Sequence, residues 1–350
     1  MRIMIVTDAW APQVNGVVRT LEALKDHLER MGNEVAVIAP TMFRTVALPT
    51  YQEIRLALWA NRPVARMIND MRPHAIHIAT EGPLGLAARR FCLRRDHPFT
   101  TSLHTRFPEY VHARTGFPIS WGYWFLRMFH KPASAVMVAA PSVRDEMETR
   151  GFRNLRLWSR GVDTEKFRPL AAGRDDVLPY PRPIWLSVGR IAVEKNIEAF
   201  LRLDLPGTKV VVGDGPLKAS VETLYPDTVF LGARFGDDLA RIYGASDVFV
   251  FPSRTDTFGL VNVEALACGT PVAAYPVHGP KDIITVPNVG SLDEDLATAC
   301  HEALTRTSRT AARDHALSFS WEACTRQFLV NLDLPGFDEA YWAESAKLPD

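Results

Sequence analysis

The chain has few cysteines, and they are spread along its whole length. Its 350 residues include four, Cys92, Cys268, Cys300 and Cys324, with no CxxC pair among them. Zinc sites and disulfide frameworks use closely spaced cysteines, so this spacing argues against both. We therefore expect buried, reduced thiols.

Net charge and long apolar runs are also lacking. Forty basic residues balance forty acidic ones, which argues against a dedicated nucleic-acid-binding protein. No segment approaches the roughly 18 to 20 apolar residues of a membrane-spanning helix. The chain also passes from Met1 and Arg2 directly into a strand, without the apolar core of a signal peptide. We expect a cytoplasmic protein whose contacts with phosphate groups or a membrane are local.

The sequence contains strands that alternate with helices along two stretches. In the first half, the strand Ile3–Asp8 is followed by an amphipathic helix, and further strands at Glu34–Pro40 and Thr45–Pro49 precede the next one, which predicts a parallel sheet covered on both faces. A segment rich in proline, glycine and charge follows Trp158–Pro169, and the alternation then restarts. We predict an α/β protein with two Rossmann-like domains facing across a cleft: residues 1–168, 169–318, and final helices at 319–350 that return to the first domain.

Residues 248–272, VFVFPSRTDTFGLVNVEALACGTPV, predict a strand, a polar loop and a helix. Asp256 or Thr257 can cap that helix, and Gly269 with Pro271 ends it. The backbone N–H groups of a helix start attract anions at this edge of a parallel sheet. These N–H groups belong to Phe258, Gly259 and Leu260.

Two acids in this segment, Asp256 and Glu264, are separated by eight positions. At about 1.5 Å per helical residue this is roughly 12 Å at most. Such a span suits a nucleotide diphospho-sugar, whose hydroxyl groups lie at both ends of an anionic centre. The alternative is a solvated loop acid and a locally paired helix acid.

Two cations and a histidine are predicted at strand ends. Arg190 and Lys195 follow a strand in VGRIAVEKN and can bracket a diphosphate, although they could also be solvated surface bases. His104 ends the strand in TSLHTRFPEYV, where a cleft-facing role competes with a structural one. His74 and His77 are interpreted as an accidental pair, since further metal ligands are not suitably spaced.

Taken together, these motifs strongly resemble the family 4 retaining glycosyltransferases of GT-B fold. In the family signature the first acid is a glutamate, where this chain has Asp256. The resemblance implies that Arg190 and Lys195 neutralise the leaving diphosphate, that Asp256 orients sugar hydroxyls, and that Glu264 binds the ribose. It further implies that His104 lines the acceptor and sugar pocket. The same resemblance adds three glycines beside the donor: Gly16, Gly213 and Gly215.

An aromatic segment, Ser120–Lys131, combines five aromatic rings with flanking bases. This composition suits a helix at a membrane interface, and arginines in Ala88–His97 could extend a basic face. The alternative is that the rings pack the first domain.

The resemblance implies transfer of a sugar from UDP-glucose or UDP-glucuronate to a lipid such as diacylglycerol, with retention and without a metal or cofactor. A GDP-mannose-dependent α-mannosyltransferase acting on a glycolipid or polysaccharide is the alternative. We expect a cytoplasmic enzyme, with possible peripheral contact at the inner face of the plasma membrane and no nucleic-acid partner. A nucleotide-sugar epimerase is a remote rival, as is a nicotinamide oxidoreductase, which would need a G-x-G-x-x-G loop.

Overall fold

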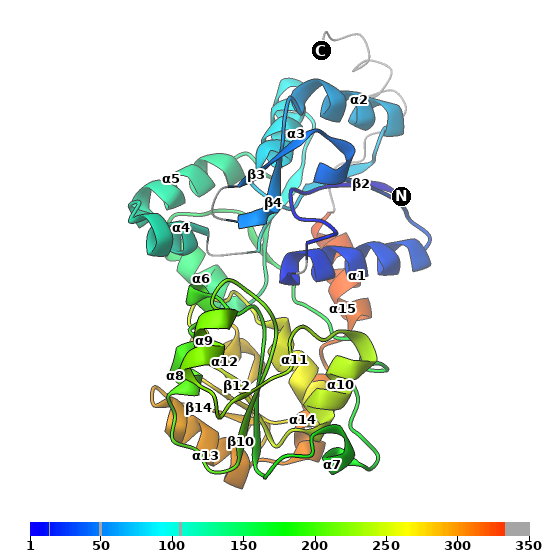
Figure 1. Ribbon diagram of the computed structural model, residues 1–350. Helices are drawn as coiled ribbons and strands as arrows, with labels where there is room; N and C mark the ends of the chain where they lie inside the picture. The colour runs from blue at the N-terminus through cyan, green and yellow to red at the C-terminus, as the bar shows by residue number, and fades with distance from the viewer. Residues whose placement is uncertain (14, 49–50, 105–106, 333–350) are drawn as a thin grey trace. The chain divides into compact units, whose positions relative to one another are not determined.

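The computed structural model describes residues 1–13, 15–48, 51–104 and 107–332. These residues divide into two compact units (Figure 1), one formed by residues 1–159 with the chain from Trp321 onward, the other by residues 160–320. Three parts of the predicted segments lie outside the described residues. They are part of the loop before Gly16, the residues directly after His104, and the last part of the predicted C-terminal segment.

The first unit is built on a parallel sheet with the strand order β2-β1-β5-β6-β7-β8. Its strands are β1 (Arg2–Val6), β2 (Glu34–Ile38), β5 (Ala75–Ile78), β6 (Thr100–Leu103), β7 (Ala135–Val138) and β8 (Leu155–Leu157). The helices are α1 (Gly16–Arg30), α2 (Asn61–Met71), α3 (Pro83–Arg94), α4 (Phe107–Thr115), α5 (Ile119–His130), α6 (Pro141–Thr149) and α15 (Trp321–Asn331), with the 3₁₀ turn η1 (Pro40–Met42).

The second unit repeats this plan with the strand order β11-β10-β9-β12-β13-β14. Its strands are β9 (Ile184–Val188), β10 (Thr208–Val212), β11 (Val229–Phe230), β12 (Val248–Phe251), β13 (Val272–Ala274) and β14 (Gly290–Leu292). Its helices are α7 (Arg174–Val177), α8 (Ile197–Leu201), α9 (Lys218–Leu224), α10 (Gly236–Ala245), α11 (Leu260–Ala267), α12 (Pro280–Ile283), α13 (Leu296–Arg306) and α14 (Arg309–Ala316), with the 3₁₀ turn η2 (Val193–Lys195). The α/β prediction of two Rossmann-like parallel-sheet domains is confirmed.

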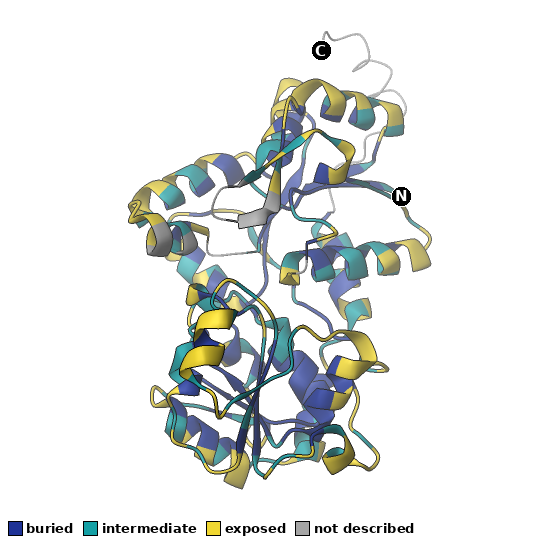
Figure 2. Ribbon diagram, in the orientation of Figure 1, coloured by how far each residue is buried: buried dark blue, intermediate teal, exposed yellow. Residues whose placement is uncertain are grey.

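The strands are continuous apolar runs because helices cover both faces of each sheet. Figure 2 shows the strand interiors as buried while the outer faces of the helices are exposed. In α1 the buried positions Val18, Leu21, Leu24 and Leu28 recur at helical spacing, so one face of the helix packs against the sheet.

Two strand predictions need correction. The strand predicted near Thr45 exists as β3 (Thr45–Leu48), but it pairs antiparallel with the unpredicted β4 (Tyr51–Ala57) and does not join the parallel sheet. The short edge strand β14, with sequence Gly-Ser-Leu, was also missed. Such residues resemble a turn, and only pairing with β13 makes them a strand.

Candidate active site

The loops that follow β9 and β12 are joined by a lysine–aspartate ion pair. Lys195 Nζ donates to Asp256 Oδ1, and the two side chains are 28% and 16% exposed. Thr255 Oγ1 donates to Glu194 O at 3.1 Å, and Asn196 Nδ2 donates to Pro252 O at 3.1 Å. Because β9 and β12 are parallel neighbours, their carboxyl ends bring the predicted cation and the predicted acid to one place.

The start of α11 presents backbone donors beside this pair. None of the described residues accepts a hydrogen bond from the N–H of Phe258, Gly259 or Leu260. Gly259 has a φ of 81° and occupies the N-cap position, so the prediction that Asp256 or Thr257 caps this helix is wrong. A cap without a side chain leaves these donors in place for an anion.

Several polar side-chain atoms of the same segment are buried without a partner in the described part of the chain. They are Asp256 Oδ2, Ser253 Oγ, and both amide atoms of Asn262. Buried polar groups are normally hydrogen-bonded, so this loop and the first turn of α11 carry more hydrogen-bonding capacity than they use internally. Sequence reasoning missed Ser253 and Asn262, although a polar residue at a buried helical position is a usable signal.

Glu264 lies further along α11 and is 6% exposed. Its Oε2 accepts a hydrogen bond from the Tyr243 hydroxyl at 3.1 Å. The tyrosine comes from α10 and was not predicted as a site residue. It fixes one carboxylate oxygen of Glu264, which orients the other.

Gly213 and Gly215 pack against neighbouring backbone. A Cβ added to Gly213 would lie 1.8 Å from Gly189 O, and one added to Gly215 would lie 2.4 Å from Ile191 O. Ile191 N donates to Asp214 O at 2.9 Å, which joins the loop after β10 to the loop that carries Arg190. The contacts of these glycines with the adjacent loop therefore already explain why side chains are excluded there.

In the first unit, Gly16 begins α1. The side chain of the preceding residue, Asn15, accepts hydrogen bonds from Val17 N and Val18 N at 3.0 Å each. Asn15 is therefore the N-cap of α1, and Gly16 is its first helical residue.

His104 follows β6 and is partly exposed. Its Nε2 lies 2.8 Å from Ser102 Oγ. His77 is fully buried and hydrogen-bonded to Thr100 and Ser102, while His74 Nδ1 accepts from Arg2 N. Both histidines are thus hydrogen-bonded within the protein, and within the described residues no three His, Cys, Asp or Glu side chains gather as a metal site.

Asp8, two positions after the end of β1, was not predicted as a site residue. Thr80 Oγ1 donates to its Oδ2 at 2.9 Å and Leu84 N to its Oδ1 at 2.9 Å, while a Cβ on Gly82 would collide with the carboxylate. Burial raises the pKa of Asp8 despite these hydrogen bonds. The carboxylate holds the N-terminus of α3 against the end of β1. A charged residue two positions after a buried strand was the available signal.

The aromatic segment divides between two faces of α5. Tyr123, Leu126 and Phe129 are buried, whereas Trp121 and Trp124 are 65% and 61% exposed. Domain packing therefore accounts for some of the rings, and the two tryptophans need another explanation. No helix among the described residues is both long and apolar enough to span a bilayer.

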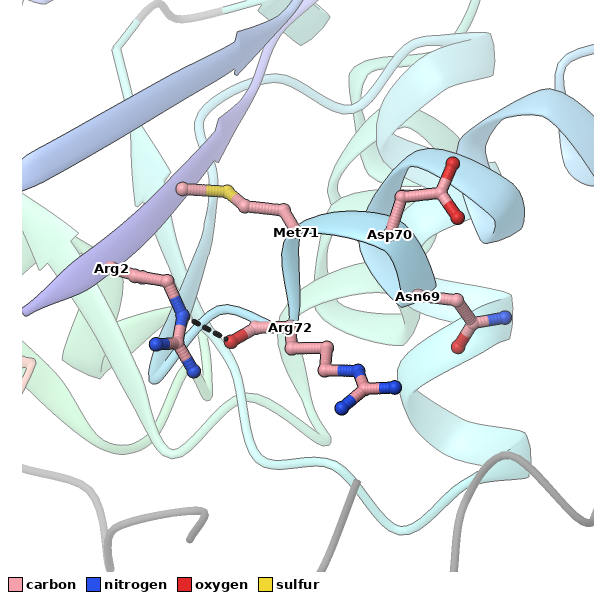
Figure 3. A pocket seen from close by; sticks show the side chains of 5 residues that line it. All are labelled: Arg2, Asn69, Asp70, Met71 and Arg72. Carbon is pink, nitrogen blue, oxygen red and sulfur yellow. Dashed lines mark hydrogen bonds between the residues drawn. The ribbon is translucent and has the colours of Figure 1, made fainter. Parts of the chain in front are cut away.

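A shallow hollow lies at the amino edge of the first sheet (Figure 3). Its lining residues are Arg2, Asn69, Asp70, Met71 and Arg72, and Arg2 Nε donates to Arg72 O at 2.9 Å. Arg2 begins β1, so this is the amino edge of the sheet. Open parallel sheets bind ligands at the carboxyl edge, where the predicted residues lie.

Comparison with known proteins finds a matching family model for each half of the chain. A model described as Glycosyltransferase Family 4 matches residues 14–166, and one described as Glycosyl transferases group 1 matches residues 182–307. The chain is 31% identical to a GDP-mannose-dependent alpha-mannosyltransferase of Mycobacterium tuberculosis, over 94% of this chain and 95% of the relative. It is 28% identical to the alpha-monoglucosyldiacylglycerol synthase of Streptococcus pneumoniae, over 91% of this chain and 81% of the relative.

Among solved structures, sucrose-phosphate synthase from Thermosynechococcus elongatus matches with a TM-score of 0.77 and 21% identity, covering 94% of this chain and 97% of that chain. The two parallel-sheet units and these matches define a glycosyltransferase of the GT-B fold class. The chain belongs to glycosyltransferase family 4, as the signature in residues 248–272 predicted.

Proposed function

We propose that the protein transfers a hexosyl group from a nucleoside diphosphate sugar to a hydroxyl group of a lipid acceptor, with retention at the anomeric carbon. The observation that carries the proposal is the position of Lys195 beside Asp256, at the strand edge where α11 offers its N-terminal backbone donors. Retention follows from the family resemblance.

Negative charge on the departing diphosphate is the main obstacle in this reaction. Preorganised cations and N–H dipoles stabilise such charge effectively. Lys195, Arg190 and the N–H groups at the start of α11 supply both in this proposal, so no metal or cofactor is required. Asp256 holds Lys195 by Oδ1 and directs Oδ2 to the sugar hydroxyls.

Glu264 binds the ribose of the donor in this proposal. Glu264→Gln keeps the shape of the side chain but removes its charge, so it should raise the donor Michaelis constant about tenfold with a smaller effect on turnover. Tyr243→Phe should raise the same constant less, because it removes only the orienting hydroxyl. An unchanged donor Michaelis constant in Glu264→Gln would rule out the ribose role.

GDP-mannose is the first donor to test, since the mannosyltransferase relative matches nearly the whole chain at 31% identity. UDP-glucose and UDP-glucuronate are the second candidates, supported with diacylglycerol by the likeness to the diacylglycerol-glycosylating relative. Each donor is incubated with the full chain and diacylglycerol in mixed micelles, and the product is identified by mass spectrometry. One donor should yield an α-linked glycolipid with and without EDTA. Failure of every sugar nucleotide to react with or stabilise the protein would refute the proposal.

Contact with an anionic membrane surface is part of the proposal, which places the enzyme at the cytoplasmic face of the membrane. Trp121 and Trp124 supply the exposed rings, and Lys131 at the end of α5 is an exposed cation. Replacing both tryptophans with serine should release the protein from anionic liposomes in flotation experiments. Trp59→Ser is the matched control, because Trp59 is 79% exposed and lies outside α5. Equal flotation of all variants with the wild type would refute the proposed membrane contact.

A further inference from the structure

Four side chains form a hydrogen-bonded chain inside the first unit. Thr100 and Ser102 stand two positions apart on β6, so they share one face of the sheet, and His104 continues that face beyond the strand. His77, on the neighbouring strand β5, bridges the two hydroxyl groups. Its Nδ1 lies 2.9 Å from Thr100 Oγ1 and its Nε2 lies 3.1 Å from Ser102 Oγ.

The chain runs from the carboxyl edge of the sheet into the core. His77, Thr100 and Ser102 are fully buried, whereas His104 is partly exposed. Ser102 Oγ lies 2.8 Å from His104 Nε2, which is the shortest of these contacts. His104, the predicted site histidine, is therefore hydrogen-bonded through its Nε2 to the buried part of this chain of side chains.

Aromatic rings fix the orientation of both histidines. Trp158 meets the His77 and His104 rings edge-on, with centroid distances of 5.7 Å and 5.6 Å. Phe328 of α15 packs edge-on against His77 at 4.9 Å. Neither Trp158 nor Phe328 is exposed, so the two imidazoles are clamped by apolar surfaces as well as by hydrogen bonds.

The Ser102 hydroxyl group couples the proton positions of the two rings. It has one proton to donate, and its neighbours are His77 Nε2, His104 Nε2 and, at 3.5 Å, Ala79 O. If the proton goes to Ala79, both rings must donate from Nε2. If it goes to one ring, the other ring must donate from Nε2. At least one of the two imidazoles therefore carries its proton on Nε2.

We propose that Ser102 and His77 are positioning residues that fix the orientation and tautomer of His104. The consequence for catalysis rests on the proposed function, in which His104 lines the acceptor and sugar pocket. The orientation itself can be tested without any substrate.

The test uses the full chain labelled with ¹⁵N-histidine, and two-bond ¹H–¹⁵N spectra that distinguish the tautomers. Signals are assigned with His77→Gln and His104→Ala. Ser102→Ala should change the ring-nitrogen signals of His104 and lower turnover about tenfold, the effect of one lost hydrogen bond, with an unchanged donor Michaelis constant. An unaltered His104 signal in Ser102→Ala would overturn the inference.

Thr101→Val is the matched control. Thr101 lies on the same strand but on the opposite face, where its hydroxyl contacts His130 Nδ1 at 2.8 Å. The Thr101→Val variant also removes a buried hydroxyl–histidine contact. It should leave the His104 signal unaltered and turnover within about twofold of wild type, a smaller effect than the loss of one hydrogen bond would have. An equal change of the His104 signal in Thr101→Val would overturn the inference.

Two further outcomes keep the test decisive. If Ser102→Ala does not fold, the wild-type spectrum decides, because two rings that both lack a proton on Nε2 would overturn the inference. If Ser102→Ala alters the His104 signal but leaves turnover intact, the positioning is supported, and the role of His104 in the proposed function fails instead.

Discussion

Lys195 and Asp256 lie 61 positions apart and contact each other directly, so the site contains its own charge neutralisation. An ammonium group has three donors, and Asp256 occupies one of them. The aspartate therefore restricts where the remaining donors point. A glutamate, which the family signature has at this position, would be longer by one methylene group.

The lysine is predicted to matter for catalysis and little for stability. Lys195→Ala should lower turnover by about 10² to 10³, because a preorganised charge near the leaving group is lost. The free energy of unfolding should change by less than about 1 kcal/mol, as expected for a partly exposed ion pair. Steady-state transfer rates and urea denaturation measure the two effects.

Lys218 provides the control for this substitution. Its side chain is 30% exposed, compared with 28% for Lys195, and it pairs with Glu222 at 3.9 Å on α9. Lys218→Ala should leave transfer unchanged. Wild-type transfer rates in Lys195→Ala would refute the role of Lys195 in neutralising the charge of the leaving diphosphate.

At the scale of elements, the loops after β9 and β10 depend on their glycines. Gly213 has a φ of 152° and no room for a Cβ, while Gly32 has a φ of 82° and open space around it. Both conformations disfavour a side chain, but only the first adds a collision with backbone.

Gly213→Ala should cost at least about 3 kcal/mol, since the backbone must move, whereas Gly32→Ala should cost about 1 to 2 kcal/mol. Donor affinity should fall in the Gly213 variant, because the loop carrying Arg190 is displaced. Thermal unfolding and titration with the donor provide the measurements. Equal losses of stability in the two variants would contradict the packing role of Gly213.

Asp247 ties three elements of the second unit together. Its carboxylate accepts from Arg174 at 2.6 Å, from Arg182 at 2.7 Å and from Ile184 N at 2.7 Å. Burial alone would raise the pKa of Asp247, but the Ile184 and Arg174 hydrogen bonds and the two arginine charges lower it overall. The folded protein therefore binds this proton less readily than the unfolded chain does.

The stabilisation from Asp247 should be fully present above the ordinary carboxyl pKa of 3.8 and be lost as the pH falls through the lowered value. Asp247→Asn should lower stability near pH 7 and flatten the loss of stability on acidification. Urea denaturation between pH 3 and pH 7 measures this difference. A wild-type slope in the variant would show that Asp247 titrates normally in the folded state.

At the scale of the whole molecule, each unit has its own core, and the last described helix belongs to the first. Phe328 of α15 packs on Trp158 with a centroid distance of 5.0 Å, while Phe249 is fully buried in the second unit. The cores therefore contain chain segments that are far apart in sequence.

Phe328→Ala should cost about 3 to 5 kcal/mol, and Phe249→Ala a similar amount, because each leaves a buried cavity. Phe328→Ala should lower the midpoint of the unfolding transition reported by tryptophan fluorescence, with donor affinity unchanged at low temperature. Phe249→Ala should lower the midpoint of the unfolding transition that shifts when the donor binds. Loss of donor affinity in folded Phe328→Ala would contradict the assignment of α15 to the core of the first unit.

The sequence alone determined the alternation of strands and helices, since apolar runs and helical spacing are local properties of the chain. It also identified the segments that carry Lys195, Asp256 and Glu264, because ends of parallel strands are recognisable from composition. Local patterns do not identify pairing partners, so β14 and the antiparallel β3–β4 pair were not anticipated.

Tertiary structure decided which side chains meet. Tyr243 reaches Glu264 from another helix, and His77 joins Ser102 across two strands, although neither pair is close in sequence. Gly213 and Gly215 likewise have neighbours that only the folded loops bring near. Such contacts arise from the register of parallel strands and the packing of distant segments, for which a sequence carries no local signal.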